Sequence, residues 1–253
     1  MGLKSMLFSM LPTKMQHDMI IKKTGFHLME KAYFTDSICT ELYMPPKQQA
    51  WKNRLSKPYG HEPEVVKWYE RNLTSKDVVF DIGSHMGYFA VLVSKLQPQS
   101  RFHGFEANWF IASYFKMNQS KHDPMRNWKL TEKFVGSSDS SEMIRIDTYI
   151  KENGSPTIFQ MDVDGEEINV LSGAKALLDS GTCTFIVEVH PKDLADRKQS
   201  DKAFVALFDT NLYDLRYLPN LRSSNTSWVD TISESEALEE YYLCASPKSS
   251  TRF

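Results

Sequence analysis

From about residue 62 onward, short apolar runs alternate with segments in which apolar residues recur at helical spacing. Val65, Trp68 and Tyr69 lie on one face of an expected helix, and the run DVVFDIG at 77–83 then predicts a buried strand. This alternation predicts an α/β fold with a mostly parallel central sheet and helices on both faces. Ligands of such sheets bind at the carboxyl ends of the strands, so the residues that follow each strand are the first functional candidates.

The same alternation continues almost to the end of the chain. Further strands are expected at 101–108, 129–137, 157–165 and 183–191. Helices are expected after Gly87, around 111–115, over 166–181 with Gly181 as its end, and over 204–212. The segments SWVDTI (227–232) and EYYLCAS (240–246) are expected to close the sheet as a C-terminal antiparallel pair, because no helix-length segment separates them.

Residues 1–60 lack this regularity. They mix methionine, lysine and aromatic residues and are interrupted by prolines. We therefore expect an N-terminal accessory or lid segment at 1–60 and the main domain at 61–253.

The loop DIGSHMGYF, which follows the first expected strand, indicates a cofactor site. Asp81 ends the strand, and Gly83 and Gly87 allow a tight turn and a close approach of a ligand, with His85 between them. The spacing is G-x-x-x-G, whereas a pyrophosphate-binding fingerprint requires G-x-G-x-x-G. Glu106 ends the next strand, where an acid typically binds a ribose diol. Together these features favour S-adenosylmethionine over a dinucleotide, and a tight turn without a ligand is the alternative.

The segment QMDVDGEEIN places several acids after the strand at 157–165. A calcium loop is excluded, because its twelfth position would be Leu171 and an apolar strand precedes it. Acids in the first turn of a helix interact favourably with the positive end of the helix dipole, which partly explains why Glu166 and Glu167 stand at these positions. Asp162 instead ends a strand in the expected cleft, where it can orient a substrate hydroxyl or act as a base.

The strand at 183–191 ends with Glu188 and His190, at the same expected edge of the sheet. We predict His190 and Asp162 as catalytic residues, and Asp164 and Glu188 as substrate-binding residues. A metal site built from Asp162, Glu188 and His190 is possible, but no spacing requires it, so no metal is predicted.

Composition limits the partners and the compartment. The formal net charge is −2, which gives no overall field that favours nucleic acid. Three cysteines lie far apart, which fits a reducing compartment. No apolar run reaches the roughly 18 residues of a membrane span. We expect a cytoplasmic protein with a small-molecule ligand, no nucleic-acid partner and no membrane span; a glycan as the acceptor is implied only by the family resemblance described next.

Five segments in order resemble the FkbM-type S-adenosylmethionine-dependent methyltransferases: VVFDIGSHMGYF, FHGFEAN, IRIDTYI, FQMDVDGEEINVLSGAKALL and FIVEVHP. The resemblance covers roughly residues 76–192. It implies a Rossmann-like class I methyltransferase fold and O-methylation, often of sugar hydroxyls in glycans or glycosylated metabolites. Carried over by position, it assigns the cofactor site to the acids and glycines of the first two segments. It also assigns Asp147 to the cofactor site, and it matches Gly165 and Glu167 to the fourth segment's motif.

The chain departs from the family pattern at three positions. Gln160 replaces a lysine, Asp164 replaces a glutamate, and Ala107 stands where a proline often follows the ribose acid. The resemblance therefore leaves open which acceptor this protein uses. A nicotinamide-dependent oxidoreductase on a similar fold and a non-catalytic binding module are the rival hypotheses.

Overall fold

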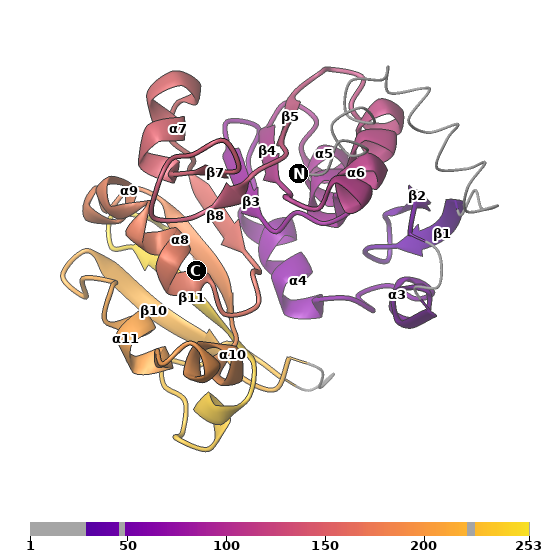
Figure 1. Ribbon diagram of the computed structural model, residues 1–253. Helices are drawn as coiled ribbons and strands as arrows, with labels where there is room; N and C mark the ends of the chain where they lie inside the picture. Colours follow the sequence, from indigo (N-terminus) through magenta and orange to yellow (C-terminus); the bar gives the residue numbers. More distant parts are fainter. Residues whose placement is uncertain (1–28, 46–48, 222–225, 253) are drawn as a thin grey trace.

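The computed structural model describes residues 29–45, 49–221 and 226–252, and a seven-stranded sheet forms its centre (Figure 1). The strands in spatial order are β10 (Tyr213–Leu218), β11 (Tyr241–Pro247), β9 (Thr184–Val189), β8 (Ile158–Met161), β3 (Val78–Ile82), β4 (Arg101–Phe105) and β5 (Trp128–Thr131). The five strands from β9 to β5 are parallel, and β11 runs antiparallel to both of its neighbours. This confirms the mostly parallel α/β sheet.

The order of the strands fixes where a ligand can bind. The chain enters the parallel part at β3, continues to β4 and β5 on one side, and later returns to place β8 and β9 on the other. The carboxyl ends of β3 and β8 therefore flank the point at which the strand order reverses. In open α/β sheets this switch point opens a crevice for ligands.

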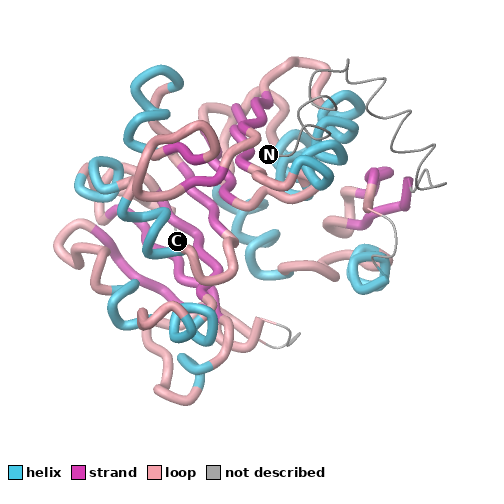
Figure 2. The backbone as a smooth tube through the Cα atoms, in the orientation of Figure 1, coloured by secondary structure: helices cyan, strands magenta, loops and turns pink. Residues whose placement is uncertain are grey.

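Helices cover both faces of the sheet, and Figure 2 shows the strands running between them. One face carries α4 (Pro63–Asn72), α5 (Tyr88–Leu96) and α6 (Trp109–His122). The other carries α7 (Ile146–Asn153), α8 (Glu167–Ser172), α9 (Lys175–Asp179), α10 (Pro191–Asp196) and α11 (Asp201–Val205). Because successive side chains of a strand point to opposite faces, Val79 packs in the first core and Phe80 in the second. Within the described ranges, no helix combines the length and the apolar character needed to cross a membrane.

The described part of the N-terminal segment packs on the first face. It contains β1 (Met29–Tyr33), β2 (Cys39–Tyr43) and α3 (Gln49–Leu55), and Phe34 and Leu42 share a core with α5 and α6. The buried Asn118 side chain of α6 accepts the Tyr43 N–H at 2.8 Å and donates to the Met86 carbonyl at 2.8 Å. One amide thus ties the N-terminal hairpin to the glycine loop. Residues 1–28 of the expected accessory segment lie outside the described residues.

Two expected elements between 129 and 181 are interrupted. The strand expected at 129–137 divides into β5 and β6 (Phe134–Val135), and β6 pairs instead with β7 (Met143–Ile144). The helix expected at 166–181 breaks into α8 and α9 at Gly173. A Cβ at Gly173 would lie 2.0 Å from the Gly136 carbonyl oxygen, so the loop after β6 occupies the path of a continuous helix. Gly181 adopts φ +60° just after α9, which confirms it as the end of that helical region.

Two expectations near the C-terminus are also corrected. The helix expected over 204–212 ends at Val205, although Phe204 and Phe208 are both buried. The expected partner of the last strand was wrong, because β11 pairs with β10, and 227–232 contributes only one isolated bridge, from Val229 to Tyr217. The 3₁₀ helix η1 (Glu236–Leu238) precedes β11. Neighbouring strands were expected from their proximity in sequence, but the strand order is decided by packing over longer distances.

Candidate active site

The carboxyl ends of β3, β4, β8 and β9 open into a cavity of about 760 Å³. The residues that line it at the sheet edge are Asp81, Glu106, Asp162, Glu188 and His190. Residues of the N-terminal segment form the facing wall: Trp51, Arg54, Lys57, Tyr59 and His61. The structure therefore brings together acids and a histidine that are more than a hundred residues apart in sequence.

The two glycines of the loop after β3 are required for different reasons. Gly83 has φ +82°, and a Cβ there would lie 1.9 Å from the Asp162 carbonyl oxygen. Gly87 has φ +83° and precedes α5, and a Cβ there would lie 2.9 Å from the Phe115 ring. Gly83 lines the cavity, whereas Gly87 is not among the described lining residues. Gly87 therefore shapes the turn and the helix packing behind the site.

Asp81 is a buried carboxyl group that faces the cavity, and no cationic side chain among the described residues pairs with it. Its side chain is part of the lining, and the residue is only 3% exposed. Burial raises the pKa of Asp81 well above its usual value, and the nearby Asp162 and Glu106 carboxylates raise it further. A ligand with a positive charge would relieve this concentration of acid.

Glu106 is held in place by the glycine loop. Its Oε2 accepts the His85 N–H at 3.1 Å, and its Oε1 accepts the Asn108 N–H at 2.7 Å. Burial raises the pKa of Glu106, although both backbone hydrogen bonds oppose the shift. Each carboxylate oxygen can accept more than one hydrogen bond, so Glu106 can still bind hydroxyl groups in the cavity.

Two polar atoms near this loop are buried without a hydrogen-bond partner, namely Ser84 Oγ and His85 Nδ1. The His85 ring stacks on Trp51, with centroids 5.4 Å apart and an 8° angle between the ring planes. Trp51 also packs against His61, with centroids 4.1 Å apart. The result is an aromatic wall beside the glycine loop with unused hydrogen-bonding capacity.

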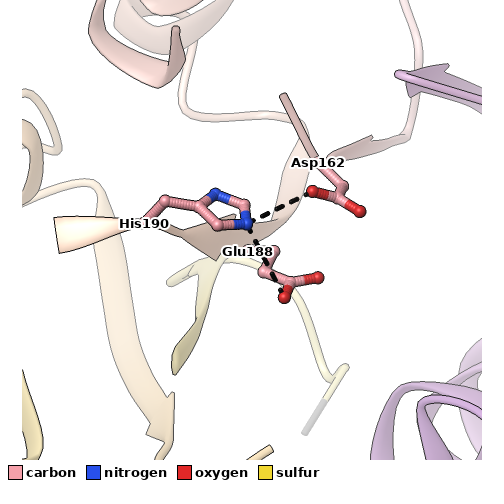
Figure 3. A group of neighbouring side chains, drawn as sticks. All are labelled: Asp162, Glu188 and His190. Carbon is pink, nitrogen blue, oxygen red and sulfur yellow. Dashed lines mark ion pairs between the residues drawn. The ribbon is translucent and has the colours of Figure 1, made fainter. Parts of the chain in front are cut away.

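Asp162, Glu188 and His190 form a compact group at the opposite side of the loop (Figure 3), here called the acid–histidine cluster. His190 Nε2 lies 3.5 Å from Asp162 Oδ1 and 3.7 Å from Glu188 Oε1. Glu188 Oε2 accepts the Tyr242 hydroxyl at 2.9 Å. The structure thus assembles residues that we predicted separately from two strand ends.

Glu167 has a larger role than helix-start chemistry. It is fully buried, and its Oε1 lies 2.7 Å from His190 Nδ1. The same oxygen accepts the N–H groups of His190 and Gly165, each at 3.2 Å. Since a carboxylate only accepts, Nδ1 donates to it and Nε2 is directed toward Asp162 and Glu188. Glu167 therefore fixes the orientation of His190.

The pKa values of the three side chains in the cluster are strongly shifted. The side chain of Asp162 is 51% exposed toward the cavity, yet partial desolvation and the neighbouring Glu188 carboxylate raise its pKa to about 7. Burial likewise raises the pKa of Glu188 to about 7. For His190 burial acts in the opposite direction, but the bond to Glu167 and the surrounding carboxylates outweigh it and raise the pKa to about 9. Such groups concentrate at functional sites.

Two further predicted site residues, Asp164 and Asp147, differ in how they relate to the cluster. Asp164 lines the cavity, but its side chain is 91% exposed and its Oδ1 is 3.7 Å from His190 Nε2. Asp147 is not among the described lining residues, and its carboxylate accepts the N–H groups of Ala176 and Leu177 at 3.1 and 3.4 Å. Asp147 therefore caps the start of α9, and its assignment to the cofactor site stays a prediction.

Several lining residues were missed by sequence reasoning. Trp51 and His61 belong to the irregular N-terminal segment, where no periodicity marks their partners. Gln160 is buried and accepts the Tyr69 hydroxyl at 2.8 Å, so this departure from the family lysine is accommodated by a tyrosine of α4. Among these residues, only Gln160 carried a signal in the sequence, namely its position near the end of a strand.

Residues 43–215 match the family of methyltransferase FkbM domains. No curated protein matches the sequence. A solved methyltransferase FkbM of Methylobacillus flagellatus is 12% identical with a TM-score of 0.50, and the match covers 69% of this chain but only 44% of that one. A precorrin-6Y C5,15-methyltransferase of Geobacter metallireducens is 13% identical (73% and 87% covered, TM-score 0.46). An rRNA methylase of Streptococcus thermophilus is 12% identical (72% and 92% covered, TM-score 0.48).

The family match spans more than half of the chain and includes every sheet-edge residue of the cavity. The likeness to the Methylobacillus flagellatus structure adds the fold, since it extends over most of the present chain. The resemblance seen in the five sequence segments is therefore confirmed, together with the Rossmann-like sheet. The chain belongs to the FkbM methyltransferase domain family.

Proposed function

We propose that this protein is an S-adenosylmethionine-dependent O-methyltransferase whose acceptor is a hydroxyl of a sugar, in a glycan or a glycosylated metabolite. The observation that supports it best is the pairing of two unlike sites in one cavity. Asp81 is buried there with no cationic partner in the described part of the chain, and the acid–histidine cluster lines the same cavity.

The residues present suit S-adenosylmethionine. Asp81 would bind its ammonium group, Glu106 its ribose hydroxyls, and Gly83 would let the backbone approach it closely. When bound, the cofactor supplies a methyl group already activated by a positively charged sulfur.

The remaining work of the protein is to align the acceptor and remove its proton. The side chains of the cavity would have to position the acceptor oxygen against the methyl group and accept its proton, because the electron pair of the broken carbon–sulfur bond would stay with the bound cofactor. Asp162 takes the hydroxyl proton, because a base works best with a pKa near the operating pH, and that of Asp162 is raised to about 7. His190 Nε2 lies 3.5 Å from Asp162 Oδ1, where a protonated imidazole attracts the carboxylate without a close hydrogen bond.

The wall facing the cluster supports a sugar as the acceptor. Trp51 and His85 present stacked rings, on which an apolar sugar face can pack. Asp162, Asp164 and Glu188 line the same cavity and can accept hydroxyl hydrogen bonds. An aromatic surface opposite several carboxylates suits a ring with many hydroxyl groups.

The cofactor is tested by thermal unfolding of the full chain with S-adenosylhomocysteine or NAD⁺. We expect stabilisation only by S-adenosylhomocysteine, and stabilisation by NAD⁺ alone would favour the oxidoreductase. Transfer of a radiolabelled methyl group to a panel of glycans and glycosides tests the reaction. Cofactor binding with no transfer to any acceptor class would favour the non-catalytic module.

His190→Ala tests the catalytic side of the cavity separately. We expect it to bind S-adenosylhomocysteine as the wild type does and to lose methyl transfer by roughly 10²–10⁴-fold. Glu41→Gln, which changes an exposed carboxylate paired with Lys121, is the matched control. Undiminished transfer by His190→Ala would remove His190 from the mechanism.

A further inference from the structure

We propose that Asp162, Glu188 and His190 bind a divalent transition-metal cation at the cavity wall, with Glu167 orienting the histidine ligand. The assignment concerns three side chains from the ends of two neighbouring strands, β8 and β9. The order of the strands, and not their spacing in sequence, brings these side chains together.

The distances within the cluster suit an ion between the side chains. One ligand atom from each residue lies within 4.8 Å of the other two. The separations of 3.5 and 3.7 Å from His190 Nε2 to the two carboxylates are too long for good hydrogen bonds. An ion with ligand bonds of about 2.0–2.4 Å places neighbouring ligand atoms roughly 2.8–3.4 Å apart. Small side-chain shifts therefore complete the geometry.

The histidine is oriented as a ligand. Its side chain is 7% exposed, and its Nδ1 donates to the fully buried Glu167 at 2.7 Å. Among the described residues, Nε2 has no partner within hydrogen-bond distance and is directed at Asp162 and Glu188 (Figure 3). Histidines that bind metals usually donate their other N–H to a carboxylate, which fixes the tautomer and the ring.

The charge around the cluster also favours a cation. Asp162, Asp164 and Glu188 all lie within 3.7 Å of one imidazole nitrogen, and Glu167 is bound to the other. Four carboxylates thus surround a group that carries at most one positive charge. The surplus of negative charge is concentrated in a partly buried site, where the attraction of a cation is strong.

The ligand set identifies the class of metal. Imidazole together with carboxylates suits Mn²⁺, Fe²⁺ or Zn²⁺, whereas Mg²⁺ and Ca²⁺ prefer oxygen ligands alone. Three protein ligands leave coordination positions open, as in catalytic metal sites. Asp162, Glu188 and His190 all line the cavity, so the open positions face the space for an acceptor.

The role of the cation rests on the proposed function. A hydroxyl oxygen of the acceptor bound to the cation loses its proton more readily, because the ion stabilises the resulting alkoxide. The O–H bond breaks, the electron pair stays on oxygen, and the proton leaves to water or to the exposed Asp164. Asp162 then serves as a ligand and no longer as the base.

The test is binding of Mn²⁺ alone to the chelator-treated full chain, measured by titration calorimetry and by pulsed electron paramagnetic resonance. We expect one Mn²⁺ per chain with modulation from a histidine nitrogen. Glu188→Gln and His190→Gln should each weaken binding at least tenfold, and His190→Gln should also lose the nitrogen modulation. Glu41→Gln is the surface control, and thermal unfolding shows that each variant is folded.

Three outcomes would overturn the site. They are no Mn²⁺ binding by the wild type above non-specific binding, the same Mn²⁺ affinity in Glu188→Gln as in the wild type, or no nitrogen modulation in the wild type. S-adenosylhomocysteine is titrated into the same samples to separate the two proposals. Cofactor binding without Mn²⁺ binding rejects the metal site and retains Asp162 as the base. Mn²⁺ binding without cofactor binding rejects the proposed function and leaves the metal site standing.

Discussion

Replacement of Asp81 by asparagine should stabilise the fold and weaken the binding of S-adenosylhomocysteine. The Asp81 carboxyl is 3% exposed, and burial and the nearby Asp162 and Glu106 carboxylates raise its pKa. In the unfolded chain the same group titrates near a pKa of about 3.9. The native state therefore binds the proton more tightly, and this contribution to stability is lost as the pH rises toward the native pKa.

The size of the effect follows from this linkage. Asparagine keeps the shape of the side chain and does not ionise. The stability of Asp81→Asn relative to the wild type should therefore rise by about 1.4 kcal/mol per pH unit from about pH 4 up to the native pKa, and stay constant above it. Urea unfolding of both proteins across this range measures the difference. An equal difference at every pH, or a variant less stable at pH 8, would refute the reasoning.

Cofactor affinity should change in the opposite direction. The carboxylate would pair with the ammonium group of the ligand, and loss of a buried charged partner costs about 2–5 kcal/mol, or roughly 30- to 5000-fold in Kd. Titration calorimetry with S-adenosylhomocysteine measures this loss. Asp179→Asn changes an exposed carboxylate paired with Lys175 and should alter neither property by more than about 0.5 kcal/mol. Wild-type affinity in Asp81→Asn would exclude Asp81 from the cofactor site.

Glu106→Gln should weaken S-adenosylhomocysteine binding at least tenfold in calorimetry, because an amide cannot accept hydrogen bonds at both of its ends as the carboxylate does. Gly83→Ala should lower the unfolding free energy in urea by at least about 2 kcal/mol more than Gly181→Ala. Both glycines have positive φ, but a Cβ at Gly83 would lie 1.9 Å from a carbonyl oxygen, whereas a Cβ at Gly181 would lie 3.4 Å from the Leu212 side chain. Equal losses would contradict this. Burial alone would raise the pKa of Asp77, but hydrogen bonds from hydroxyl, guanidinium and backbone donors, Arg252 among them, lower it. Asp77→Asn should therefore lower the free energy of unfolding by about 1–3 kcal/mol at pH 7. The loss should shrink as the pH falls below about 3.9, the pKa of the carboxyl group in the unfolded chain. A loss that is the same at every pH would contradict this.

The elements that could be predicted are those with strong local patterns. β3, β8 and β9 are short, mostly apolar runs, because both faces of a central parallel strand are buried. The elements that were mispredicted have boundaries set by distant groups. The contact between Gly136 and Gly173 divides a helical pattern into α8 and α9, and no local signal at Gly173 reveals the neighbour that does so.

The candidate site divides in the same way. Asp81, Glu106, Asp162 and Glu188 could be identified because each lies at or just after the carboxyl end of a strand, and these ends share one edge of a parallel sheet. Asp147 carried an equally good motif position, but its helix packs so that the carboxylate caps α9. A match to a motif specifies the neighbours of a residue in the sequence, but it does not specify which surface of the fold the side chain reaches.

By itself, the sequence determined the parallel sheet, the glycine turn and the acids at the strand ends, because hydrophobic periodicity and glycine torsions are local properties. Only the tertiary structure decided that Glu167 orients His190 and that Trp51 stacks on His85. Those contacts join residues from different elements, and the free energy that selects them comes from burial of whole faces against one another. The acid–histidine cluster therefore arises from strand order, which the spacing of its residues does not encode.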